Sequence, residues 1–396
     1  MESRHKFDFD KLTQRRGTAS LKWDVTEGEL PMWVADMDFE CAPCIKSAVI
    51  RRAEHGIYGY NIVPDEWAEA YADFWKRRHG WEMKREYLTF TTGIVPAISS
   101  LVRRLTNIGD SVALFTPVYD IFFHSIENAG RHTLEVPLVY ADGEYHIDFA
   151  DLGEKLKHPL TTLFILCNPH NPCGNVWTAE ELRRIAALCR AHGVAVISDE
   201  IHCSLTDVGV EYTPFASVSA EAAEISVTCL SASKTFNIAG MQSAAIYAEN
   251  EALRNKAVRG VNSDEVAEPN CFAVAATVAA LNDGEEWLDE AREYLDANKA
   301  RVREFIAENI PSLRCVKQRC TYLVWIDCSA ITSDSDELCE FIRKRTGLML
   351  SSGAQYRGNG RYFLRLNTAC PRARLEDGLV RLKSGIEQYI AFKKGN

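Results

Sequence analysis

The chain has 396 residues, 46% of them hydrophobic and 25% charged, as in an ordinary globular protein large enough for two or three domains. Its net charge of −10, without a basic cluster, argues against a nucleic-acid-binding protein. No apolar run is long enough to cross a membrane and no apolar signal region follows the N-terminus, so we expect a cytoplasmic protein without a membrane partner.

The thirteen cysteines form no repeating frame. In a reducing compartment, scattered cysteines of this kind usually serve as small buried hydrophobic residues. Cys41 and Cys44 have the spacing of a redox motif, but no strand precedes them and no second pair could complete a zinc site. We therefore expect neither a redox centre nor a bound metal.

Between residues 88 and 250, apolar β-branched runs alternate with amphipathic helical segments. The expected strands are Ser111–Phe115, Leu134–Val139, Thr161–Cys167, Val194–Ser198, Ile225–Leu230 and Ala244–Ala248. The clearest helix follows Thr178, which can form a capping box with Glu181. Alternating strands and helices predict a largely parallel sheet covered on both faces.

The pattern changes near residue 285, where a long amphipathic helix begins and runs towards Pro311. A smaller unit of strands and helices follows, with elements expected at Tyr322–Asp327, Leu338–Arg345, Tyr362–Leu366 and Leu375–Tyr389. We predict a large domain over 51–286 and a small C-terminal domain over 287–396. The segment 1–50 is expected to pack against the small domain.

Two of the expected strands end in polar side chains. Asp199 and His202 follow one strand, and Ser231, Ser233 and Lys234 follow the next. In α/β sheets the carboxyl ends of the strands are where ligands bind. A lysine that forms a Schiff base with a pyridine cofactor needs a shielded amine, an acid for the ring nitrogen and donors for a phosphate. This set therefore points to pyridoxal 5′-phosphate (PLP).

In this interpretation Asp199 keeps the ring nitrogen protonated, and Ser231 and Ser233 donate hydrogen bonds to the phosphate. His202 bonds to the network near the ring or to a cofactor oxygen. Each residue also has an ordinary alternative: a surface lysine, a helix-capping aspartate or turn serines.

Three other segments offer cofactor contacts. Gly93, Ile94 and Val95 open an apolar helix, so their N–H groups could bind a phosphate. Tyr119 ends another strand and could stack on the pyridine ring. Asn171 lies in a turn-rich loop after a buried strand and could donate to the phenolic oxygen of the cofactor.

Arg365 lies inside an apolar strand, where a charge needs a partner. A substrate carboxylate is a suitable partner, because a guanidinium group can bind it through two hydrogen bonds. An internal salt bridge is the competing explanation.

Taken in chain order, the residues named above resemble those of fold-type I PLP enzymes of the aspartate aminotransferase superfamily. The chain is most similar to the MalY/PatB-type C–S lyases, the cystathionine β-lyase branch. The similar segments are Leu30–Phe39, Tyr58–Tyr60, Asn168–Pro172, Asp199–His202, Lys234–Asn237, Leu364–Asn367 and Cys370–Arg372.

The resemblance implies a large domain with a mostly parallel seven-stranded sheet and a smaller α/β C-terminal domain. It also implies a homodimer, in which Tyr58 (or Tyr60) reaches the phosphate bound by the partner subunit. Trp33 and Ala35 would lie on a segment that closes over the substrate. Many aminotransferases have a phosphate-binding arginine eight residues after the lysine, whereas this chain has Gln242.

The activity implied by the resemblance is α,β-elimination on L-cystathionine or related cysteine S-conjugates, which gives homocysteine or another thiol, pyruvate and ammonia. Such an enzyme would act in amino-acid metabolism, including methionine biosynthesis, with Lys234 removing the Cα proton. Two alternatives remain open at this point. One is a class I/II aminotransferase, and the other is a regulatory protein of this fold that acts through a transcription-factor partner.

Overall fold

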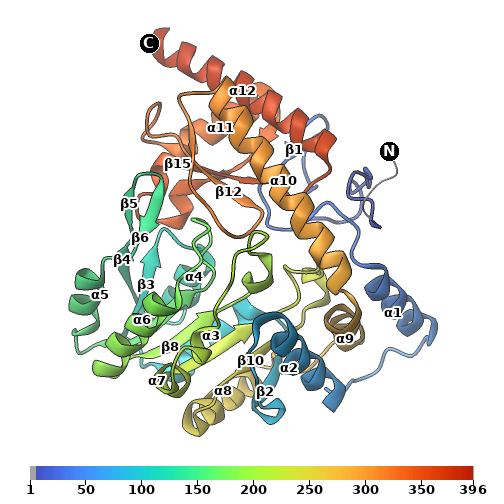
Figure 1. The fold of residues 1–396 in the computed structure, drawn as a ribbon, viewed down its shortest axis with the longest axis vertical. Helices are drawn as coiled ribbons and strands as arrows, with labels where there is room; N and C mark the ends of the chain where they lie inside the picture. Colours follow the sequence, from blue (N-terminus) through green and yellow to red (C-terminus); the bar gives the residue numbers. More distant parts are fainter. Residues whose placement is uncertain (1–5, 396) are drawn as a thin grey trace.

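A computed structural model describes residues 6–395. A seven-stranded sheet forms its centre, with the strand order β2-β10-β9-β8-β7-β3-β4 (Figure 1). The strands are β2 (Leu88–Thr91), β3 (Ser111–Thr116), β4 (His132–Pro137), β7 (Thr161–Cys167), β8 (Ala195–Asp199), β9 (Ser226–Leu230) and β10 (Ala244–Tyr247). Only β10 runs antiparallel to its neighbours β2 and β9, so the predicted mostly parallel sheet is confirmed.

Two details of the predicted strands differ from the structure. The seventh strand, β2, had no predicted bounds, because only two of its four residues are buried and its apolar run is short. The fourth strand ends at Pro137 rather than at Val139. Val139 instead begins β5 (Val139–Ala141), which forms a hairpin with β6 (Glu144–His146).

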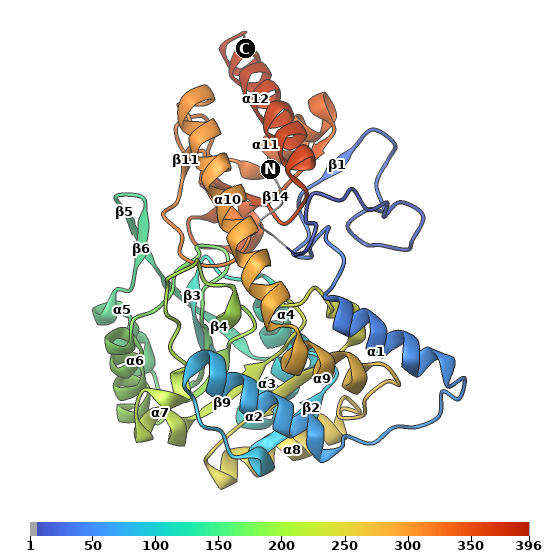
Figure 2. The same cartoon turned by 45° about the vertical axis from the view of Figure 1, so that its right-hand side comes forward.

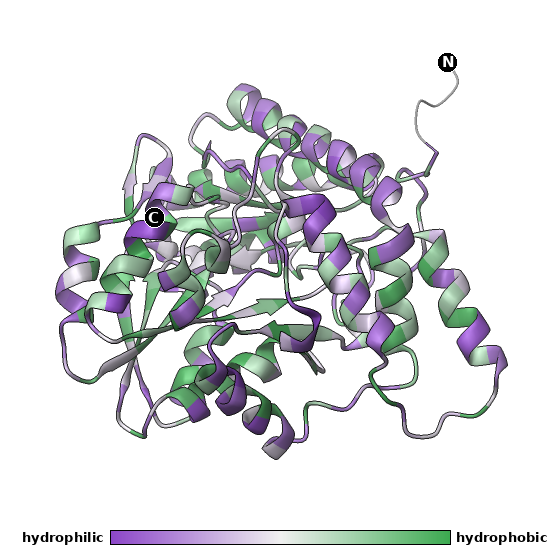
Figure 3. Ribbon diagram, turned by 60° about the horizontal axis from the view of Figure 1, so that its bottom comes forward, coloured by the Kyte–Doolittle hydropathy of each residue, from purple (hydrophilic) through white to green (hydrophobic). Residues whose placement is uncertain are grey.

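Helices cover both faces of the sheet because successive strand residues point to opposite sides. On β3, Val112 and Leu114 join the core beneath one set of helices, α3 (Ile94–Leu105), α4 (Ile121–Glu127) and α8 (Glu251–Ser263). Ala113 and Phe115 join the opposite core beneath α5 (Phe149–Leu156), α6 (Ala179–Ala191) and α7 (Ala220–Ile225). Figure 3 shows hydrophobic and hydrophilic residues interspersed along the helices of the molecule, as expected for helices with one buried side.

The predicted capping box at the start of α6 is confirmed. The Glu181 N–H donates to Thr178 Oγ1 at 3.2 Å, and the Thr178 N–H donates to Glu181 Oε2 at 2.8 Å. Two N–H groups that would otherwise lack partners are therefore satisfied, which explains why the helix begins here.

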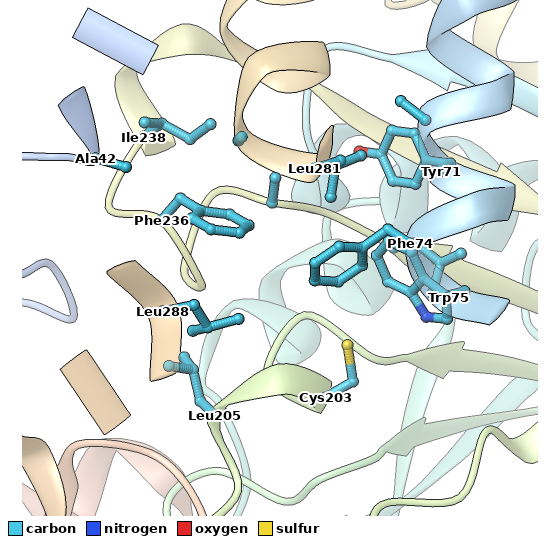
Figure 4. Close-up of a cluster of buried hydrophobic side chains, with 14 of the residues drawn as sticks. Ala42, Tyr71, Phe74, Trp75, Cys203, Leu205, Phe236, Ile238, Leu281 and Leu288 are labelled. Carbon is cyan, nitrogen blue, oxygen red and sulfur yellow. The ribbon is translucent and has the colours of Figure 1, made fainter. Parts of the chain in front are cut away.

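The loop after β9 carries Lys234, and we call it the lysine loop. An aromatic core lies beneath it, between β10 and the helices α1 (Pro43–Glu54), α2 (Asp65–His79) and α9 (Ala273–Asp283) (Figure 4). Phe236, two residues after Lys234, is fully buried there. Its ring centroid lies 6.1 Å from that of Phe74 and 6.3 Å from that of Trp287. The core therefore anchors the loop that carries the lysine.

The long helix α10 (Glu285–Asn309) crosses from the sheet to a C-terminal unit (Figures 1 and 2). That unit contains an antiparallel sheet of order β11-β12-β15-β14. Its elements are β11 (Arg314–Cys315), β12 (Leu323–Asp327), α11 (Ser335–Thr346), β13 (Leu348–Met349), β14 (Ser351–Ser352), β15 (Phe363–Asn367) and α12 (Arg372–Gly395). No helix within residues 6–395 is long and apolar enough to span a membrane.

The N-terminal segment contacts the C-terminal unit directly. Strand β1 (Leu30–Pro31) pairs in parallel with β13, and Trp23 and Met32 lie in the core formed by α10, α11 and α12. The division of the chain into 1–50, 51–286 and 287–396 stays a prediction.

A buried ion cluster holds the N-terminal segment in place. The side chains of Asp38 and Lys22 are each 1% exposed, and Lys22 Nζ lies 3.2 Å from Asp38 Oδ2. Arg15 Nη1 lies 2.7 Å from Asp38 Oδ1, Arg374 Nη1 lies 3.4 Å from Oδ2, and the indole N–H of Trp23 donates to Oδ1 at 2.9 Å. One carboxylate therefore pairs with three cationic side chains that come from both ends of the chain.

The change Asp38→Ala should lower the free energy of unfolding by about 3–5 kcal/mol, because it leaves the Lys22 ammonium buried without its nearest carboxylate. Urea unfolding followed by circular dichroism measures the loss. Glu387→Ala on the exposed side of α12 is the control, with an expected change within about 0.5 kcal/mol. Equal stability of the two variants would contradict this role of the cluster.

Candidate active site

The polar groups predicted from sequence gather at the carboxyl ends of β7, β8 and β9. These strands are parallel neighbours, with Cys167 paired to Asp199 and Asp199 paired to Cys229. The three chain segments that follow them begin at the same edge of the sheet. They carry Asn171, then Asp199 and His202, then Ser231, Ser233 and Lys234.

Lys234 is partly buried and donates a hydrogen bond from Nζ to the Ala35 carbonyl oxygen at 2.6 Å. Burial lowers the pKa of its amine to about 8, while the Asp36 carboxylate raises it, Arg365 lowers it and Asp199 raises it. Removal from water disfavours the ammonium form, so a fraction of the amine is uncharged near neutral pH. An uncharged amine can act as a nucleophile and as a base.

Asp199 is 4% exposed. Burial raises the pKa of its carboxyl to about 7, against smaller lowering effects of the Ile201 N–H, which donates to Oδ1 at 3.1 Å, and of Lys234. No cation of residues 6–395 forms an ion pair with this carboxyl. A protonated pyridine nitrogen would supply the missing partner, so the carboxyl fits the predicted cofactor.

His202 also fits a polar ligand. Its Nδ1 atom is buried and has no hydrogen-bond partner within the described chain. Burial, together with the charges of Lys234 and Arg365, lowers the pKa of the imidazole to about 3, so the ring is neutral. A buried ring nitrogen without a partner is costly unless a ligand completes its hydrogen bond.

Arg365 lies on β15 and is 5% exposed. Its Nη2 donates to the Trp33 carbonyl at 3.0 Å, its Nη1 lies 3.3 Å from Asn171 Oδ1, and its guanidinium sits 5.0 Å above the Tyr356 ring. Every partner within residues 6–395 is neutral, and the Nε atom has none. The internal salt bridge considered from sequence is not found there, and a ligand carboxylate fits this site.

The expected phosphate donors lie on two elements. Gly93 is the N-cap of α3, so the N–H groups of Ile94 and Val95 have no partner within the helix. The Ser231 hydroxyl already donates to the Ser243 carbonyl at 2.8 Å and lies 2.9 Å from Ser233 Oγ. Ser233 is therefore the more available of the two serines, and phosphate binding by these groups stays a prediction.

Tyr119 and Tyr58 lie in different surroundings. Tyr119 is partly buried after β3, and its N–H donates to the Asn171 carbonyl at 3.1 Å. Tyr58 lies in the connection between α1 and α2, is 58% exposed and donates to Ala53 O at 2.7 Å. The structure does not bring Tyr58 to the site of its own chain.

Residues 33–39, which we call the strap, lie over the lysine and are held by side chains that the sequence analysis did not single out. Asn237 Nδ2 donates to Met37 O at 3.0 Å and to Phe39 O at 2.9 Å, and Asn367 Nδ2 donates to Asp36 O at 2.7 Å. Both asparagines end motifs quoted above, Lys234–Asn237 and Leu364–Asn367. Their position in these motifs was the only available signal.

No group of three or more His, Cys, Asp or Glu side chains within residues 6–395 could hold a metal ion. The charges of the site are instead arranged for organic groups. Lys234 and Asp199 lie at the large sheet, and Arg365 faces them from β15.

The chain matches the family model for aminotransferase class I and II over residues 30–382. It is 43% identical to cystathionine beta-lyase PatB of Bacillus subtilis (strain 168), with 96% of this chain and 100% of that protein covered. Protein MalY of Escherichia coli (strain K12) is 32% identical, with 96% and 99% covered. The structure of the PLP-bound C–S lyase from Staphylococcus hominis superposes with a TM-score of 0.90 at 32% identity, covering 96% of this chain and 99% of that one.

The fold is that of the PLP-dependent enzymes of fold type I, and PLP is the cofactor of the solved C–S lyase that this chain resembles. This chain belongs to the aminotransferase class I and II family, and its similarity to the MalY/PatB branch is confirmed.

In the apoprotein, Lys234 should react with acetic anhydride with a midpoint near pH 8, because burial lowers the pKa of its amine to about 8. An ordinary lysine has its midpoint near 10.4. Competitive labelling followed by peptide mass spectrometry measures both, with the exposed Lys317 as the reference. A Lys234 midpoint as high as that of the reference would show that the amine is not shielded.

Proposed function

We propose that this protein is a PLP-dependent carbon–sulfur lyase that acts by α,β-elimination on L-cystathionine or related cysteine S-conjugates. The products are a thiol (homocysteine from cystathionine), pyruvate and ammonia. The observation that carries the proposal is the 43% identity to a cystathionine beta-lyase over nearly the full length of both chains. The site geometry supports it, since a shielded amine and an arginine without a carboxylate partner face one region.

The residues of the site divide the binding of the cofactor among them. Asp199 would hold the protonated ring nitrogen, and Tyr119 would pack against the ring. Asn171 would donate to the phenolic oxygen and His202 would bond to a cofactor oxygen or to the network near the ring, while Ser231, Ser233 and the N-terminus of α3 would bind the phosphate. When bound, PLP draws away the electron pair left at the substrate Cα after its proton is removed.

Two charged side chains act on the substrate. Arg365 binds the α-carboxylate and so fixes the direction of the Cα–H bond. Such orientation can lower a barrier by several kcal/mol. The free Nζ of Lys234 takes the Cα proton, which its lowered pKa of about 8 permits close to neutral pH. The strap, with Trp33 and Ala35, covers this region and limits access of water.

Wild-type protein loaded with PLP should release pyruvate and free thiol from L-cystathionine without an added 2-oxo acid. The Lys234→Ala variant should lose this activity by at least about a thousandfold and lack the visible absorption band of the lysine-bound cofactor, because it lacks both the anchor and the base. Product assays and absorption spectra measure these outcomes. A strict requirement of the wild type for a 2-oxo acid would instead identify an aminotransferase.

We further propose a homodimer with two sites. The connection between α1 and α2 carries exposed large residues, with Ile57 68%, Tyr58 58%, Tyr60 102% and Ile62 80% exposed. A contiguous exposed apolar segment usually marks an interaction surface. The similarity to the MalY/PatB branch suggests that Tyr58 or Tyr60 reaches the phosphate bound by the partner.

Hybrid dimers test this arrangement. Tyr58→Ala and Lys234→Ala should each be nearly inactive alone, but a mixture unfolded and refolded together should recover about a quarter of wild-type activity. Half of the dimers are then hybrids, and each hybrid has one site free of both changes. Mixtures refolded separately are the control. A mixture that stays inactive would place Tyr58 in the site of its own subunit, whereas full activity of Tyr58→Ala alone would place it outside both sites.

The cytoplasm is the proposed compartment. All thirteen cysteines are free, and eight of them are buried. Free thiols in this number suit a reducing environment.

A further inference from the structure

The Ala35 carbonyl oxygen in the middle of the strap accepts hydrogen bonds from two side chains. One donor is Lys234 Nζ at 2.6 Å, and the other is the Tyr322 hydroxyl at 3.1 Å. The two donors are far apart in sequence and come from different parts of the fold: the lysine loop follows β9, and Tyr322 immediately precedes β12. Tyr322 therefore shares a hydrogen-bond acceptor with the amine.

Tyr322 is built rigidly into the C-terminal unit. It is fully buried, with 0% exposure. Its carbonyl accepts from the Thr368 N–H at 2.8 Å and from Thr368 Oγ1 at 3.0 Å, and its hydroxyl has Ala35 O as its single hydrogen-bond partner within residues 6–395. A hydroxyl on such a fixed frame holds the Ala35 carbonyl in one direction.

We propose that Tyr322 is a positioning residue for Lys234: through the Ala35 carbonyl, its hydroxyl places the freed amine and weakens that amine's hold on a proton. This inference rests on the proposed function, in which the free amine is the base. Tyr322 is not among the residues proposed to bind the cofactor or the substrate carboxylate, so its effect is indirect.

Two physical effects act in the same direction. A carbonyl oxygen that already accepts one hydrogen bond is a weaker acceptor for a second, so the ammonium form of Lys234 gains less from Ala35 O while Tyr322 is bonded there. The hydroxyl also points the positive end of its dipole at the oxygen beside the amine, which disfavours a cation. Removing the hydroxyl should therefore favour the protonated lysine.

The other groups that face the amine stay unchanged when this hydroxyl is removed. They are Asp36 on the strap, Asp199 at the end of β8, the neutral His202 after it and Arg365 on β15. Tyr322→Phe keeps the ring and its packing. A change in the titration of Lys234 can then be assigned to the lost hydroxyl.

Competitive labelling of the apoprotein with acetic anhydride is the direct test, since it needs neither cofactor nor substrate. The midpoint for Lys234 should rise by at least about 0.5 pH unit in Tyr322→Phe. Tyr389→Phe is the matched control, because Tyr389 is also fully buried in the C-terminal unit and donates to Thr332 and Glu337, away from the strap. Equal midpoints in Tyr322→Phe and Tyr389→Phe would overturn the proposal.

The pH profile of the loaded enzyme gives a second readout. With L-cystathionine, kcat of Tyr322→Phe should fall about threefold to tenfold at pH 7 with KM changed less than about twofold, and the deficit should shrink as the pH rises. A deficit of equal size at every pH would indicate a merely structural role and overturn the inference. Absence of pyruvate from the wild type would refute the proposed lyase, whereas the labelling result would still decide the role of Tyr322.

Discussion

The removal of the Lys234 amine from water is the constraint on which the rest of the site depends. A buried ammonium is unfavourable unless it is paired, and a fully paired one would be a poor base. Here the amine donates to a neutral acceptor, the Ala35 carbonyl, at 2.6 Å. The carboxylates of Asp36 and Asp199 act on it only through longer-range electrostatics. The amine is therefore shielded without being neutralised by a bonded carboxylate.

The strap is held from both parts of the fold. From the large sheet, Asn237 binds the backbone of Met37 and Phe39, and from the C-terminal unit, Asn367 and Arg365 bind the carbonyls of Asp36 and Trp33. The buried cluster at Asp38 adds charge pairing at the far end. Because Arg365 and Lys234 contact the same short segment, the proposed carboxylate-binding group and the proposed base keep a defined spacing.

Much of the fold followed from local patterns. The β-branched runs marked the parallel strands, and Thr178 with Glu181 marked the start of α6, because these signals depend on neighbouring residues alone. The sequence analysis gave no bounds for the short strand β2, because only two of its residues are buried and so few carry little periodic signal. It also missed the break between β4 and β5, where a Pro-containing turn interrupts the pattern. Tyr58 was assigned by resemblance to a neighbouring subunit, and within its own chain it lies away from the site.

The sequence by itself determined the identity of the chemical groups and the strand ends that carry them, because parallel strands necessarily bring Asp199 and Lys234 to one edge of the sheet. Only the tertiary structure decided which neutral groups surround them. The Ala35 carbonyl meets the Lys234 amine across 199 residues of chain and the Tyr322 hydroxyl across 287. Backbone carbonyls have no side-chain signature, and a buried tyrosine resembles any core aromatic residue. Such contacts depend on long-range packing, which no local pattern records.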